Sequence, residues 1–160
     1  MRAIYDRWKN YLMFENDLED SSEVAKASII TKDNKILILL RSSYITDYAD
    51  EWDLPGGHLR RAEEAEIGLD REVFEETGLD ISSFGHEKIM TMDNIHFYLI
   101  RYSKNSEEIA IEVSEEHTDF AFISYEEIQN FNISEKFIKV INKSVIYEDL
   151  KRINILLSFV

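Results

Sequence analysis

The chain has 160 residues, of which 32 are Asp or Glu and 18 are Lys or Arg, so its net charge is −14. This charge disfavours duplex nucleic acid and anionic membranes as partners. The absence of cysteine excludes disulfides, thiolate nucleophiles and cysteine-based zinc sites. No apolar run approaches the roughly 20 residues that span a bilayer, and no signal-peptide core opens the sequence. We therefore expect one globular domain in the cytoplasm.

The first third of the chain predicts one helix followed by strands. Residues 1–22 place apolar side chains at helical spacing and end in an acidic loop that starts at residue 15. Residues 24–31 and 35–40 are rich in β-branched and aliphatic side chains on either side of a polar turn, which predicts a β-hairpin. A polar loop over 42–51 leads to a short strand at 52–54, which we expect to stop at Pro55 and the glycine pair Gly56-Gly57.

The remaining elements alternate between helices and strands. A helix is predicted over residues 63–77, with Leu69 and Val73 facing inward and Gly78 as its C-cap. A second hairpin is predicted over 86–92 and 95–102, and further strands over 109–113 and 119–123. Ser124 suits the N-cap of a helix over 125–130, and two more helices are predicted over 134–143 and 148–159. This order favours an α/β fold with a mixed sheet between helices.

Carboxylates crowd the predicted helix over residues 63–77. Glu72, Glu75 and Glu76 are three and four residues apart, so their side chains share one face of the helix. Like charges at this spacing repel each other, which suggests that a cation normally accompanies them. Hard divalent cations such as Mg²⁺ take oxygen ligands of this kind.

The stretch from Gly57 to Leu79 resembles the signature box of the Nudix hydrolases. Gly57, Glu63 and the run Arg71-Glu72-Val73-Phe74-Glu75-Glu76-Thr77-Gly78-Leu79 fill its fixed and aliphatic positions. The preceding Trp-x-Leu-Pro-Gly-Gly and the later Glu115-Glu116-His117 extend the likeness over roughly residues 24–130. The resemblance implies a single domain over 1–160, built as an α/β/α sandwich with a mixed β-sheet between helices. Residues 1–22 would be an N-terminal extension, and residues 132–160 would form C-terminal helices.

The same resemblance implies hydrolysis of the pyrophosphate linkage in a nucleoside diphosphate derivative, such as a nucleoside triphosphate or a dinucleoside polyphosphate. Mg²⁺ or Mn²⁺ would assist, because a diphosphate concentrates negative charge that bound cations neutralise. The alternative is a non-catalytic nucleotide-binding or regulatory module on the same fold. A small nucleotide is the expected partner, and homodimerisation through the N-terminal segment or a sheet edge is compatible with the resemblance.

The resemblance also assigns roles to individual residues. The implied metal ligands are the Gly56 carbonyl and the carboxylates of Glu72, Glu75 and Glu76. Arg71 is expected to orient a glutamate through a charge-assisted bond, and Glu63 to support the loop-helix geometry. The general base stays open between Glu116, on a later loop, and Glu72, inside the box.

The chain departs from the common family pattern at two positions of the box. Arg60 stands in place of a glutamate, and Ala62 in place of a glycine. The adjacent Arg60 and Arg61 could contact substrate phosphates or lie in a solvated loop. Tyr98 lies near the tyrosine typical of diadenosine polyphosphate hydrolases, although a core strand residue is the other interpretation. The sequence leaves the substrate open.

Overall fold

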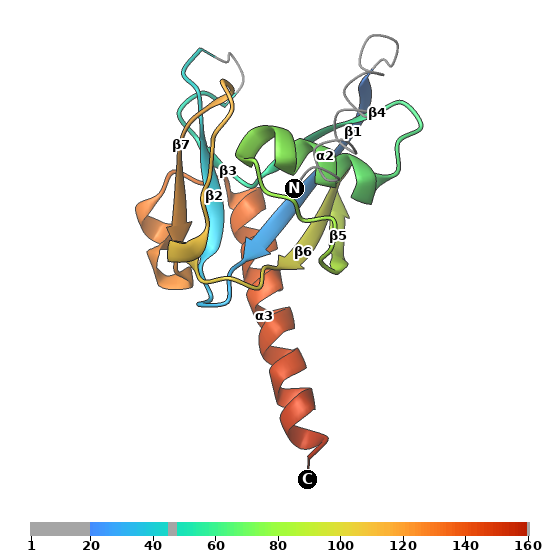
Figure 1. The fold of residues 1–160 in the computed structure, drawn as a ribbon, viewed down its shortest axis with the longest axis vertical. Coiled ribbons are helices and arrows are strands. Elements are labelled where there is room, and N and C mark those ends of the chain that lie inside the picture. Colours follow the sequence, from blue (N-terminus) through green and yellow to red (C-terminus); the bar gives the residue numbers. More distant parts are fainter. Residues whose placement is uncertain (1–19, 45–47, 160) are drawn as a thin grey trace.

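The computed structural model describes residues 20–44 and 48–159 (Figure 1). The elements, in chain order, are β1 (Asp20–Ile30), β2 (Ile36–Arg41), β3 (Trp52–Asp53), β4 (Gly56–Arg60), α2 (Ala65–Thr77), β5 (His86–Met92), β6 (Ile95–Arg101), η1 (Ser106–Glu108), β7 (His117–Ile123), η2 (Tyr125–Asn130) and α3 (Glu135–Leu157). No helix in the described part of the chain is long and apolar enough to cross a membrane.

The strands form one mixed sheet. Strands β3, β2, β1, β6 and β5 follow one another across it, while β4 also pairs with β1, and β7 with β2. The central pair β1–β6 is parallel, and the other pairs are antiparallel.

Two helices cover opposite faces of this sheet. Because side chains alternate along a strand, Ala27 of β1 packs with Leu69 and Val73 of α2. Ile30, three residues later and so on the other face, packs with Val140 of α3. Each face thus has its own apolar layer, which confirms the predicted sandwich of a mixed sheet between helices.

Both predicted hairpins are present. Strands β1 and β2 meet with Ile30 opposite Ile36, and β5 and β6 pair along their length. Strand β1 begins at Asp20, inside the segment predicted as an acidic loop. The rest of the helix predicted over 1–22 lies outside the described residues.

Strand β4 was not predicted, because two glycines after a proline are typical of a loop. Here the glycines allow a close strand pairing instead. Gly56 has φ +123°, and a Cβ atom at this position would lie 2.2 Å from the carbonyl oxygen of Ala25 on β1. Only glycine permits this approach of the two backbones.

Two other predictions were wrong. Residues 109–113 form no strand, because their loop follows the end of α2: the Glu112 N–H donates to the Thr77 carbonyl, and the Ser114 N–H to the Glu76 carbonyl. The two predicted C-terminal helices are the single helix α3. The four residues between the predicted helices continue the helix, and Val145 among them packs against the apolar layer of the sheet.

Candidate functional site

The candidate site is built on the turn from β4 into α2. The Arg60 N–H donates to Glu63 Oε2 at 2.8 Å, and the Glu63 N–H donates to the Arg60 carbonyl at 3.0 Å, which closes the turn. At the other end, Gly78 has φ 73° and its N–H donates to the Phe74 carbonyl, which confirms the predicted C-cap. A glycine-bounded loop and helix therefore present the carboxylates.

Arg71 is the centre of an ionic cluster, with only 3% of its surface exposed. Its Nε and Nη2 donate to the two oxygens of Glu63 at 3.0 and 2.9 Å, a bidentate pair. Its Nη1 donates to Glu72 at 2.5 Å and to Glu75 at 3.2 Å, and Nη2 also donates to the His58 carbonyl. Arg71, which was expected to orient one glutamate, therefore contacts three of them: Glu63, Glu72 and Glu75.

Two carboxylates of this face have raised pKa values. Burial raises the pKa of Glu76 to about 8, against the opposing influence of Lys26 and of the Gly56 N–H, which donates to Glu76 Oε2 at 2.7 Å. Burial also raises the pKa of Glu72 to about 7, and the charges of Glu75 and Glu116 raise it further, against the effect of Arg71. The neighbouring positive groups therefore do not fully offset the cost of burying ionised carboxylates at Glu72 and Glu76.

Lys26 is a site residue that the sequence did not reveal. Its buried ammonium group donates to Asp53 Oδ2 at 2.8 Å, to the Leu54 carbonyl at 2.9 Å and to the Gly56 carbonyl at 3.0 Å. It therefore fixes the backbone that enters the glycine pair. The Gly56 carbonyl oxygen has two lone pairs, so it can accept this bond and still serve as a ligand.

The loop before β7 reaches the same face. The Ser42 N–H donates to the Glu116 carbonyl at 2.8 Å, while the Glu116 side chain is exposed and close enough to Glu72 to influence its pKa. The next residue, His117, was not predicted: its Nε2 lies 3.9 Å from Glu76 Oε1. Burial lowers the pKa of His117 to about 4, with Lys26 adding to the effect, so the ring is neutral at neutral pH.

The three residues considered for substrate contact lie in different environments. Arg60 is buried and its Nη2 lies 3.9 Å from Glu75 Oε1, so it belongs to the carboxylate cluster rather than to a solvated loop. Arg61 is exposed beside it. Tyr98 is buried in the apolar layer under α2. The structure therefore gives no support to a substrate-binding role for Tyr98, and a core strand residue is the better interpretation.

The donors of this site suit a hard cation. Every atom that could bind the cation is a carboxylate or carbonyl oxygen. A Cβ atom on Gly57 would lie 2.3 Å from Glu72 Oε2, so the glycine leaves the room that this carboxylate occupies. Within the described residues, no three His, Cys, Asp or Glu side chains already form a metal-holding group. The Gly56 N–H engages Glu76 and Arg71 engages Glu72, so these carboxylates would have to turn to share a cation.

Comparison with known proteins gives a family. The model of the NUDIX domain matches residues 22–143, which include the whole box and both flanking loops. The chain belongs to the NUDIX family. The resemblance drawn from the box is thus confirmed. No curated protein matches the chain.

Solved structures share this Nudix fold. A MutT protein from Methanosarcina mazei Go1 superposes with a TM-score of 0.61 at 23% identity, covering 78% of this chain and 93% of that one. A C. elegans Ap4A hydrolase superposes with a TM-score of 0.65 at 17% identity, and the match covers 79% of this chain and 98% of that one. The E. coli dihydroneopterin triphosphate pyrophosphohydrolase superposes with a TM-score of 0.64 at 16% identity, and the match covers 82% of this chain and 99% of that one. At such identities the likeness shows the fold alone.

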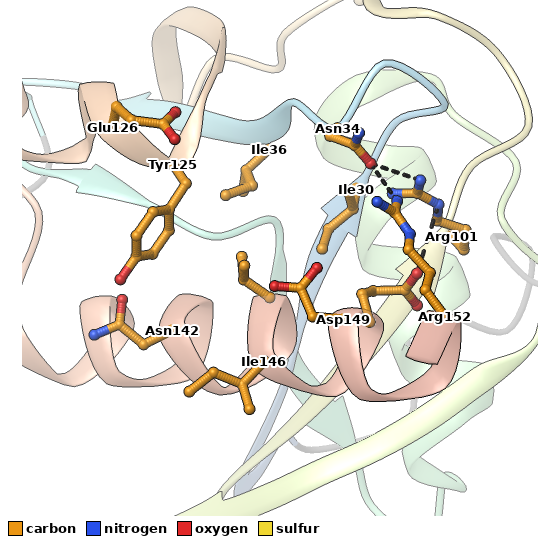
Figure 2. Close-up of a pocket in the computed structure, with 12 residues that line it drawn as sticks. Ile30, Asn34, Ile36, Arg101, Tyr125, Glu126, Asn142, Ile146, Asp149 and Arg152 are labelled. Atoms are coloured by element: carbon orange, nitrogen blue, oxygen red, sulfur yellow. Dashed lines mark hydrogen bonds and ion pairs between the residues drawn. The ribbon is translucent and has the colours of Figure 1, made fainter. Parts of the chain in front are cut away.

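A separate cavity of about 440 Å³ lies away from the Nudix box. It opens between α3 and the β1–β2 turn (Figure 2), and its lining includes Tyr125, Arg101 and Arg152 but no residue of the box. The two arginines share Asn34 Oδ1 as an acceptor, at 2.7 and 2.6 Å. The cavity therefore belongs to the contact between α3 and the end of the sheet.

The raised pKa values predict how the stability of the metal-free protein depends on pH. A carboxyl group whose pKa is higher in the folded state stabilises the fold fully at low pH, and this contribution is lost as pH rises through the folded pKa. Between pH 6.5 and 8, we expect the melting temperature in excess chelator to fall as Glu72 and Glu76 ionise. The lowered pKa of His117 acts in the opposite direction, because the unfolded chain loses that proton near the ordinary histidine pKa of about 6.5, but it is one group against two.

The measurement is a series of thermal melts across this pH window. The variant Glu76→Gln should show a flatter profile, while the exposed Glu66→Gln should follow the unmodified protein. A melting temperature that stays level or rises with pH in the unmodified protein would contradict the burial of charge at Glu76.

Proposed function

We propose that this Nudix chain is a hydrolase that cleaves the pyrophosphate linkage of a small nucleotide with the help of Mg²⁺ or Mn²⁺. The observation that carries the proposal is the ionic cluster in which the buried Arg71 holds Glu63, Glu72 and Glu75 beside the glycine backbone of β4. An ordinary solvated helix face would not bury its arginine, so a purely structural role for these charges is disfavoured.

Glu72, Glu75, Glu76 and the Gly56 carbonyl are the ligands that we propose for the cation. When bound, Mg²⁺ or Mn²⁺ supplies positive charge that offsets the diphosphate and polarises a phosphoryl oxygen. Arg71 keeps the carboxylates of Glu72 and Glu75 on one side of the helix, which limits the entropy lost when they converge. The ammonium group of Lys26 donates to the Gly56 carbonyl and so keeps this carbonyl in place.

The general base is proposed to be Glu116 or Glu72. Glu116 is exposed, and its backbone is fixed by the bond from Ser42, so its side chain is free to meet a water beside the diphosphate. Glu72 has a pKa of about 7, which suits proton transfer near neutral pH, but Arg71 engages it. Arg60 and Arg61, at the edge of the same cluster, are proposed contacts for substrate phosphates.

The substrate class is proposed from the chemistry of the site together with the family. The similar structures include an Ap4A hydrolase and a dihydroneopterin triphosphate pyrophosphohydrolase. A nucleoside triphosphate and a dinucleoside polyphosphate are therefore the first substrates to test.

The test is a hydrolysis panel of nucleoside triphosphates, dinucleoside polyphosphates, ADP-ribose, NADH, nucleotide sugars and capped RNA, with Mg²⁺ or Mn²⁺. We expect metal-dependent turnover of at least one compound, and product identity shows which phosphorus is attacked. On that substrate, a loss in Glu116→Gln that Glu115→Gln does not share assigns the base to Glu116. Absence of turnover across the panel would contradict the proposed activity.

A non-catalytic nucleotide-binding module remains the second candidate. It shares the fold and the site, so it is distinguished by the outcome of the same panel. Saturable nucleotide binding without release of phosphate products would favour it. The complete set of box glutamates argues for the hydrolase, because a binding module has no need of all of them.

A further inference from the structure

The outward side of α3 carries an apolar stripe along its C-terminal half. Ile146, Leu150, Ile153 and Leu157 are each more than half exposed. Their spacing of four, three and four residues places them on one face of the helix, as in the seam of a coiled coil. On the same face, the exposed Lys143 lies one turn before Ile146, and the exposed Lys139 lies two turns before it. Between Lys143 and Ile146 this face of the helix therefore changes from charged to apolar.

Nothing in the described part of the chain covers this stripe. The sheet lies on the other side of α3, where Val140, Ile141 and Ser144 are buried. At the edge of the domain, Lys151 pairs with Glu87 of β5, and Arg152 bonds Asn34 of the β1–β2 turn. The C-terminal turns of α3 run past the sheet (Figure 1). Contiguous apolar surface of this kind marks an interaction site.

We propose that the stripe is the interface of a homodimer, in which it pairs with the same stripe of a second copy in antiparallel orientation. A twofold axis between Leu150 and Ile153 places Leu150 opposite Ile153 of the second copy, and Ile146 opposite its Leu157. Every apolar side chain of the stripe then meets an apolar side chain, as an isologous interface requires.

The shape of the molecule has room for this arrangement. In the antiparallel pairing, the domain of the second copy lies beyond the C-terminal turn of α3, where Figure 1 shows no part of the domain. The twofold axis therefore places the two domains on opposite sides of the paired helices. The overhang of α3 past the sheet is the feature that permits this.

The charge of the segment also favours a second copy. Residues 146–159 contain two acidic and two basic side chains, so they are neutral in a chain whose net charge is −14. Two copies of this acidic protein meet with least repulsion at such a place. A second copy is therefore a suitable occupant.

Sedimentation of the full chain over a concentration series tests the dimer. Ile153→Asp alters a residue of the stripe whose side chain is 51% exposed. Ile155→Asp alters a residue with a similar exposure, 57%, on the opposite side of the helix. Each dimer contains the substitution twice, so we expect Ile153→Asp to raise the dissociation constant about a hundredfold or more. Ile155→Asp should change it less than about threefold. Raised salt should tighten the association, because it screens the repulsion between acidic copies.

Two results would overturn the proposal. One is an unmodified protein that stays monomeric up to about 1 mM. The other is equal weakening by Ile153→Asp and Ile155→Asp. Equal melting temperatures of the two variants would show that both are folded. Because the readout is mass rather than hydrolysis, the test is independent of the proposed activity.

The orientation of the helices can be tested with cysteines, since the chain has none of its own. When a Leu150→Cys copy and an Ile153→Cys copy are mixed and oxidised, antiparallel pairing predicts disulfides mainly between the two different variants. Disulfides mainly within each variant, or none of either kind, would overturn the antiparallel arrangement.

Discussion

Glu76→Gln is expected to lower kcat/KM for the substrate found in the panel by about a hundredfold or more. Glu76 Oε2 is engaged by the Gly56 N–H, which orients the carboxylate toward the proposed cation. An amide at this position keeps the size of the side chain but removes the charge and one of the two acceptor oxygens. The measurement is steady-state hydrolysis across a series of Mg²⁺ concentrations.

The control for this prediction is Glu66→Gln, an exposed residue in the first turn of the same helix. It should retain nearly full activity. The melting temperature of metal-free Glu76→Gln should not fall, because a neutral group replaces a buried acid whose pKa burial raises to about 8. Full activity of Glu76→Gln would overturn its role as a ligand, and a much lower melting temperature would show that the substitution disturbs the fold.

Arg71→Met is expected to lower the free energy of unfolding by about 3–5 kcal/mol, because it leaves the buried Glu63 without its cation. Burial raises the pKa of Glu63, but Arg71 and Arg60 together outweigh it and hold the pKa of that carboxyl below its usual value. Methionine fills most of the volume of the arginine stem, so lost packing contributes little. The measurement is denaturant unfolding of the metal-free protein.

Two further variants make this prediction specific. Arg61→Met, at an exposed position in the same loop, should change the stability by less than about 0.5 kcal/mol. Adding Glu63→Gln to Arg71→Met should recover part of the loss, because the uncompensated charge is then absent. A loss of less than about 1 kcal/mol in Arg71→Met would mean that the cluster is a solvated surface network.

The spacing of the box residues was sufficient to predict the loop, the helix α2 and its glycine cap. That information is local, because three- and four-residue separations decide which side chains share a helix face. The same rule accounts for the contact of Arg71 with Glu75, four residues later. It did not identify Glu63, which lies outside the helix and reaches Arg71 through the turn after β4.

The residues that the sequence did not reveal act across long separations. Lys26 and Asp53 are 27 positions apart, and a lysine within an apolar strand carries no sign of its partner. His117 is buried because β7 pairs with β2 and brings it under the site, which depends on the topology of the sheet. Strand β4 was missed for a similar reason, since its glycines are explained only by the nearness of β1.

The parallel pairing of β1 with β6 has a consequence for biosynthesis. Strand β1 leaves the ribosome early, but its partner along one whole edge lies some seventy residues later in the chain. Closing so long a loop is slow, so a nascent chain that already contains the complete box still exposes an open strand edge. Such edges are where polypeptides associate wrongly. The segment with the chemistry therefore cannot mature as an autonomous module, and its assembly waits for the arrival of β6.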